Sequence, residues 1–161
     1  MAAALRDMKE SGPQQQIVAE LDAATARLGA AVAGLSDEQA SRPAEDGWSV
    51  KDQLTHLTFW HEMRFFELSR IARGGRAGFP GAAEEEIEHI NQQMVANRRS
   101  LPLSQVIADL GFAREMVRQA VLSAPDDRLA PSVFEEMGPN GAGHDLMHAE
   151  VIEAWRKKEG I

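Results

Sequence analysis

Helical periodicity is the feature that most limits what this chain can fold into. Between residues 14 and 35, apolar side chains recur at steps of three and four, which places them on one face of an α-helix. These side chains belong to Ile17, Leu21, Ala24, Leu28, Val32 and Leu35. Similar spacing recurs in 49–73, 84–99, 102–124 and 142–158, and no stretch alternates polar and apolar residues over the length of a strand. The sequence therefore predicts an all-α protein.

Capping and helix-breaking residues set the expected helix boundaries. Ser49-Val50-Lys51-Asp52 has the S-x-x-D pattern of a capping box, so it predicts the start of the second helix. The polar segment 36–47 is expected to be a loop, and long connections are expected at 74–83 and 126–141. Four main helices and a shorter one at 84–99 then form a four-helix bundle with a long crossover and one extra short helix.

Length, charge and cysteine content narrow the class of protein. The 161 residues fit one domain, 1–161, in which 1–13 is expected to be a flexible tail. The net charge of -8 argues against a nucleic-acid partner, because the phosphate backbone attracts basic surfaces. No stretch approaches the ~18 apolar residues of a membrane span, and no segment resembles a signal peptide. Together with the absence of cysteine, this predicts a cytoplasmic protein whose thiol chemistry would need a thiol cofactor.

Three histidines are candidate metal ligands. His144 and His148 are four residues apart, so their side chains lie on one face of the last helix, with Cβ atoms about 6 Å apart. His56 lies at the edge of the apolar stripe of the second helix. Three imidazoles and an open fourth position are typical of a catalytic metal site, and imidazole alone does not choose among Zn²⁺, Ni²⁺ and Fe²⁺. The alternative is that all three are hydrogen-bonded histidines at the core edge or on the surface.

Other polar residues near these histidines have weaker claims to a role. His61 lies on the apolar stripe itself, where it is a buried hydrogen-bond donor behind the ligands, a fourth ligand or part of an interface. Asp145 and Glu150 are candidates for proton transfer or for orienting a ligand, but the sequence favours a solvent-facing or helix-stabilising role for each. Trp60 and Met63 are candidates to line the pocket, and core packing is their alternative.

Two segments resemble a known superfamily. Trp48-Ser49-Val50-Lys51-Asp52-Gln53-Leu54-Thr55-His56-Leu57 resembles the W-S-x-x-[DE]-x-[LI]-x-H-[LI] segment that opens the second helix of DinB/YfiT-like proteins. The segment from His144 to His148, followed by Ile152 and Trp155, is similar to the C-terminal H-x-x-x-H helix of that superfamily. Asn91 with Leu101-Pro102-Leu103 is similar to the middle segment of members related to the mycothiol-dependent maleylpyruvate isomerases.

This resemblance implies a four-helix bundle, often homodimeric, with a divalent metal held by His56, His144 and His148. Characterised relatives include S-transferases and isomerases that use mycothiol, bacillithiol or glutathione, and some metal-dependent hydrolases. The expected function is therefore a thiol-dependent S-transferase or isomerase acting on a small molecule, with the metal activating a thiolate. The alternatives are a hydrolase that uses a metal-bound water and a non-catalytic, dimeric helical stress or interaction protein. The question of enzymatic activity stays open at this point, with a metal-dependent transferase or hydrolase favoured.

Overall fold

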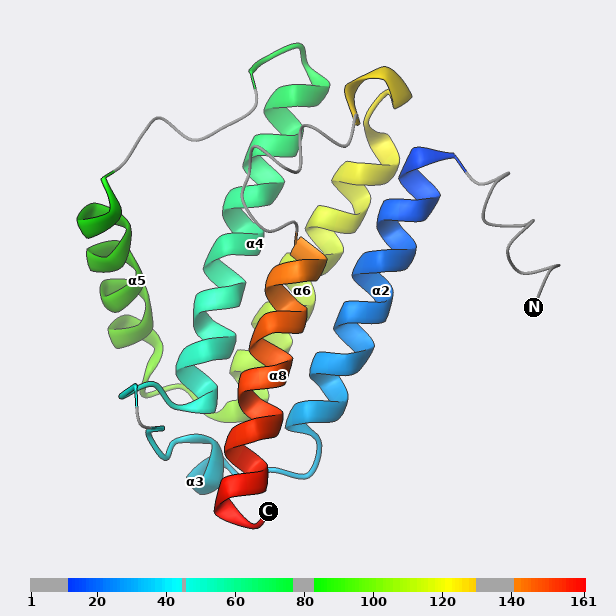
Figure 1. Ribbon diagram of the computed structural model, residues 1–161. Helices are drawn as coiled ribbons and strands as arrows, with labels where there is room; N and C mark the ends of the chain where they lie inside the picture. The colour runs from blue at the N-terminus through cyan, green and yellow to red at the C-terminus, as the bar shows by residue number, and fades with distance from the viewer. Residues whose placement is uncertain (1–11, 45, 77–82, 130–140) are drawn as a thin grey trace, which may run out of the picture.

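The computed structural model describes residues 12–44, 46–76, 83–129 and 141–161, and this part of the chain is helical (Figure 1). The predicted tail falls almost entirely outside the described residues. Six α-helices and a 3₁₀ turn are present in the described ranges: α2 (Pro13–Val32), α3 (Asp37–Ala40), α4 (Val50–Ala72), α5 (Glu84–Arg98), α6 (Leu103–Ser123), η1 (Asp126–Arg128) and α8 (Gly141–Glu159). An isolated bridge between Pro43 and Ser49 is the one β-type pairing in those ranges. No described helix combines the length and the apolar character needed to cross a membrane.

Four long helices, α2, α4, α6 and α8, form the bundle. Figure 1 shows that α2 and α8 run in one direction, whereas α4 and α6 run in the opposite direction. Contacts are most extensive between α4 and α6 and between α2 and α8. Helix α5 packs outside the bundle against α4, on the long crossover that joins the parallel helices α4 and α6. The predicted four-helix bundle with a long crossover and one extra helix is therefore confirmed.

The core lies along the bundle axis in two apolar clusters. One cluster holds Leu28, Leu54, Leu57 and Ile152 among its most buried members, and the other holds Val18, Leu68, Val117, Val121 and Leu129. On α2, all the predicted apolar positions from Leu21 to Val32 are buried, which is the one-faced burial that the periodicity predicts.

The prediction that 36–47 is a loop throughout was wrong, because this segment contains helix α3. The Ser36 hydroxyl accepts a hydrogen bond from the Gln39 amide at 3.1 Å, and the Gln39 side chain accepts one from the Ser36 amide at 2.9 Å. This reciprocal capping box stabilises a single helical turn, and its S-x-x-Q pattern is visible in the sequence. The carboxylate of Asp37 also accepts a hydrogen bond from the amide of Leu103 at 2.6 Å. Helix α3 therefore fixes the start of α6.

Candidate metal centre

The start of α4 positions the first histidine. Ser49 Oγ accepts a hydrogen bond from the amide of Asp52 at 3.1 Å, and Asp52 Oδ2 accepts one from the amide of Ser49 at 2.9 Å, so the predicted capping box is confirmed. Because the helix then begins at Val50, Gln53 and His56 are three residues apart within its first two turns and share one face. That face is directed at α8.

The start of α8 positions the other two histidines. The helix begins at Gly141, so His144 lies in its first turn, as predicted, and His148 lies one turn later. Helix α8 approaches α4 closely at this end: a Cβ atom on Gly141 would lie 2.8 Å from Arg64 Nη1 and 3.1 Å from His61 Cε1. The small size of glycine therefore allows α8 to lie close enough to α4 for its histidines to reach His56.

The three predicted ligands converge. His144 Nε2 lies 3.1 Å from His56 Nε2 and 3.1 Å from His148 Nε2. The ligand atoms of all three residues lie within 4.8 Å of one another, and in the part of the chain that the structure describes this is the one group of three or more such residues. His56 and His148 are each 8 % exposed, and His144 is half-buried. The cluster is therefore largely withdrawn from solvent.

The geometry and the hydrogen bonds of the cluster fit a metal ion. Two nitrogens that each lie about 2.1 Å from one tetrahedral ion are roughly 3.4 Å apart, close to the 3.1 Å of the two His144 contacts. Gln53 Oε1 lies 2.6 Å from His148 Nδ1 and can only accept a hydrogen bond, which assigns the hydrogen to Nδ1. His148 Nε2 then presents its lone pair to His144. One hydrogen on His144 Nε2 could satisfy only one of its two neighbours, whereas a cation would satisfy all three nitrogens.

Burial keeps the three histidines neutral. Desolvation is the largest cause in each case, and it lowers the pKa of His56 to about 4, that of His144 to about 3 and that of His148 to about 4. Mutual repulsion among the imidazoles lowers the pKa of His56 and His144 further, whereas the Asn91 side chain acts in the opposite direction on His56. At neutral pH the imidazoles are therefore in the form that binds metals.

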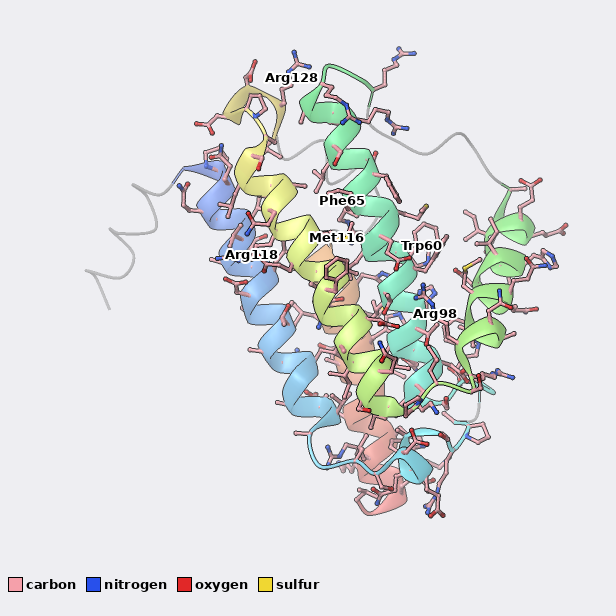
Figure 2. All side chains as sticks on the ribbon, turned by 180° about the vertical axis from the view of Figure 1, so that it is seen from behind. Trp60, Phe65, Arg98, Met116, Arg118 and Arg128 are labelled. Atoms are coloured by element: carbon pink, nitrogen blue, oxygen red, sulfur yellow. The ribbon has the colours of Figure 1, made fainter. Side chains whose placement is uncertain are left out.

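Two tryptophans flank His56. The ring of Trp48 lies edge-on to the imidazole with 5.1 Å between centroids, and that of Trp60 does so at 6.2 Å. Trp60 lies between α4 and α5 (Figure 2), where its indole N–H donates to Asn91 Oδ1 at 3.0 Å. Both rings are half-buried, so they cover His56 with apolar surface. Trp60 is a candidate from the sequence to line the site, with core packing as its alternative. Trp48 is not a candidate from the sequence, because as the residue just before the helix cap it carries no spacing signal toward His56.

Asp145 lies in a different environment from the solvent-facing one that the sequence favoured. Its side chain is completely buried, with Oδ1 2.8 Å from His61 Nε2 and Oδ2 2.9 Å from Arg114 Nε. Burial alone would raise the pKa of this carboxyl, but the hydrogen bond from His61 and the charge of Arg114 outweigh it and hold the pKa below its usual value. The prediction that Asp145 is solvent-facing was wrong, because both partners come from distant helices.

The structure places the two remaining candidates, His61 and Glu150, outside the group of converging ligands. His61 is fully buried and donates to Asp145, so it is a hydrogen-bond donor and does not belong to the group of converging ligands. Glu150 is exposed and pairs with Arg27 of α2 at 3.2 Å, which fits a solvent-facing role. Gln53 and Arg114 were not singled out from the sequence. The three-residue spacing from His56 could have identified Gln53, whereas nothing local identifies Arg114.

Comparisons with known proteins agree with this architecture. The family described as "Mycothiol maleylpyruvate isomerase N-terminal domain" matches residues 21–156. A solved structure of an uncharacterised protein from Escherichia coli UTI89 is similar in fold, with a TM-score of 0.73 and 15% sequence identity over 96% of this chain and 98% of that chain. No curated protein has significant sequence similarity to the chain. Since the family match covers most of the sequence, the chain belongs to the mycothiol maleylpyruvate isomerase N-terminal domain family, within the DinB/YfiT-like superfamily.

Proposed function

We propose that this protein binds a divalent metal ion through His56, His144 and His148 and uses it in thiol-dependent S-transfer or isomerisation of a small molecule. The observation that carries the proposal is the convergence of three neutral imidazoles, two buried and one half-buried, on one point. The thiol part is supported by the family match, whose description names mycothiol and maleylpyruvate isomerase. In a thiol-dependent reaction a cofactor would supply the thiol, because the chain contains no cysteine.

The site supplies the conditions that such chemistry needs. A divalent cation at this position would lower the pKa of a thiol or water that reaches it, so that the nucleophile forms near neutral pH. Gln53 holds His148 in the tautomer that presents Nε2, and the rings of Trp48 and Trp60 exclude water from the His56 side. The first turn of α8 adds the positive end of a helix dipole beside His144, which favours an anionic ligand.

Metal content is the first test of the proposal. Mass spectrometry of the purified protein is expected to find close to one zinc, nickel or iron ion per chain. The triple variant His56→Ala, His144→Ala and His148→Ala should lose the ion while keeping its helical circular dichroism. His89→Ala is the matched control, because His89 is exposed and lies outside the cluster. Native protein that takes up none of the three metals after reloading would contradict the proposal.

Turnover assays then separate the candidate reactions. Metal-loaded protein is tested with mycothiol, bacillithiol or glutathione against a panel of electrophiles and cis-unsaturated acids. Metal-dependent turnover that requires the thiol supports the proposal. Metal-dependent cleavage of esters or amides without thiol would favour the hydrolase alternative, and a loaded protein with neither activity would favour the non-catalytic alternative.

A further inference from the structure

Asp145 lies between His144 and His148 in the sequence of α8, and its carboxylate is buried. The side chain of Asp145 is 0% exposed, and each of its two oxygens contacts a polar side chain. Oδ1 accepts from His61 Nε2 at 2.8 Å, and Oδ2 lies 2.9 Å from Arg114 Nε and 2.8 Å from Arg114 Nη2. The contact from Arg114 Nε to Oδ2 is a charge-assisted hydrogen bond, and Nη2 adds an ion-pair contact to the same oxygen. The position of Asp145 is therefore fixed from two sides.

The three residues come from three different helices. His61 is on α4, Arg114 is on α6 and Asp145 is on α8. The candidate metal ligands join two of the same helices, with His56 on α4 and His144 and His148 on α8. However, α4 packs mainly on α6 and α8 packs mainly on α2, so the direct contact between α4 and α8 is much smaller. Few interactions therefore determine how the two ligand-bearing helices are placed against each other.

Because α4 and α8 run in opposite directions, the His61–Asp145 hydrogen bond lies next to the three-histidine cluster. Helices α4 and α8 are antiparallel (Figure 1), so the step from His56 to His61 along α4 corresponds to a step toward the start of α8. At that start, Gly141 lies against His61, since a Cβ atom there would be 3.1 Å from His61 Cε1. The His61–Asp145 hydrogen bond therefore sets the axial register of α8 directly beside the contact between His56 and His144.

We propose that Asp145, His61 and Arg114 form a clamp that fixes the register of α8 on α4 and thereby sets the metal affinity of the three-histidine site. This inference rests on the proposed metal-binding function. None of the three residues is a metal ligand, and all three are positioning residues. A buried ion pair adds little net stability compared with apolar residues of the same volume, so stability alone does not account for it here. The positions of ligands relative to one another, in contrast, determine metal affinity directly.

The carboxylate of Asp145 lies behind the two ligands of α8, and Arg114 compensates its charge. It favours positive charge at His144 and His148, whereas the guanidinium of Arg64 disfavours positive charge at His144. The hydrogen bonds from His61 and Arg114 keep the carboxylate from binding the ion itself, so the clamp acts on the site through its geometry.

The test compares Co²⁺ binding with stability in the full-length protein. Metal-free wild type and variants are titrated with Co²⁺, and the d–d absorption gives the Kd and the coordination geometry. Urea unfolding of the metal-free proteins gives stability separately. Asp145→Asn and His61→Leu are expected to bind Co²⁺ about 10- to 100-fold more weakly, with an altered d–d spectrum, as changes of residues behind metal ligands commonly do. His61→Gln should restore most of the affinity, because its amide N–H can replace the donor to Asp145.

Val121→Ala is the matched control for loss of stability. Val121 is fully buried on α6, in the second apolar cluster, and the variant should be less stable in urea with an unchanged Co²⁺ affinity. If Asp145→Asn does not fold, the His61→Leu and His61→Gln pair decides, because both keep the Asp145–Arg114 ion pair. Wild-type affinity and spectrum in His61→Leu would overturn the clamp. Absence of Co²⁺ binding in the wild type would instead overturn the proposed function, and the clamp with it.

Discussion

At the scale of single residues, Gln53 decides which nitrogen of His148 faces the other histidines. Its Oε1 accepts from His148 Nδ1 at 2.6 Å, and Gln53 itself is only 4% exposed. A neutral imidazole has one donor and one acceptor nitrogen, so this hydrogen bond leaves the Nε2 lone pair pointing at His144. The metal-binding form of His148 is thus selected before any ion arrives.

Gln53→Leu tests this assignment. The substitution keeps the side-chain volume but removes the acceptor, so His148 is free to rotate and to change tautomer. We expect Zn²⁺ affinity, measured by competition with a chelator, to fall by about 10- to 100-fold. Gln53→Glu keeps an acceptor at the same position and should bind Zn²⁺ at least as well as the wild type. Equal affinities for the leucine and glutamate variants would show that the hydrogen bond has no part in the site.

The lowered pKa values of the histidines predict an acid-sensitive metal-free protein. His56, His144 and His148 titrate near 6.5 when unfolded but at about 4, 3 and 4 when folded. Below pH 6.5 the unfolded chain therefore binds more protons, so stability falls as the pH falls from 6.5 toward 4, by up to about 1.4 kcal/mol per pH unit for each group. Urea unfolding of the metal-free protein between pH 4.5 and 7.5 measures this slope.

The triple histidine-to-alanine variant is the control for the pH dependence. It lacks the three buried imidazoles but keeps every carboxylate and also His61, whose pKa is lowered by burial as well. Its stability should therefore fall less steeply below pH 6.5 than that of the wild type. Parallel slopes in the two proteins would contradict the assignment of these histidines as buried and neutral.

At the scale of elements, the capping box at Ser49 fixes where α4 begins and hence the phase of its polar face. The box is buried, and its Asp52 also pairs with Arg99 at 3.2 Å, close to the start of α6. The same type of box at Ser36 caps a single helical turn, and its two hydrogen bonds are exposed. The two boxes therefore provide a matched comparison within one chain.

Ser49→Ala is expected to lower the free energy of unfolding by about 1 kcal/mol, because the amide of Asp52 loses its acceptor in a buried position. Ser36→Ala should cost less, since water can replace the lost hydrogen bond at an exposed cap. Urea unfolding of both variants measures the difference. A larger loss for Ser36→Ala would mean that α3, and not the start of α4, contributes more to the stability of the bundle.

At the scale of the whole molecule, the homodimer implied by the family resemblance stays a prediction. Large apolar side chains are exposed on the helices of the bundle, and the most exposed of them in the described ranges are Phe112 on α6 at 70% and Phe66 on α4 at 58%. Contiguous exposed apolar patches are found at contacts between subunits, so these side chains are the ones to test. We expect a mass of about 35 kDa by light scattering, twice the 17.6 kDa of one chain, and a shift toward monomer in Phe112→Asp. A concentration-independent mass of one chain would contradict the dimer.

The sequence by itself determined the helices and the histidine pair. Both are local properties: residues three or four apart share a helix face, so Leu21 to Val32 and His144 with His148 could be placed from spacing alone. The box at Ser49 is also local, and its prediction was confirmed. The position of His56 at the edge of its apolar stripe made it a candidate partner of that pair, and the family resemblance then supported the link.

Only the tertiary structure decided which polar side chains are buried and what they bind. His148 and Gln53 are 95 residues apart, His61 and Asp145 are 84 apart, and Arg114 and Asp145 are 31 apart. A carboxylate such as Asp145 is stable without water only when its partners satisfy it, and those partners lie on other helices. From the sequence, solvent was the expected surrounding of Asp145. The packing of α8 against α4 and α6 placed it in the interior, beside the site that its neighbours His144 and His148 form.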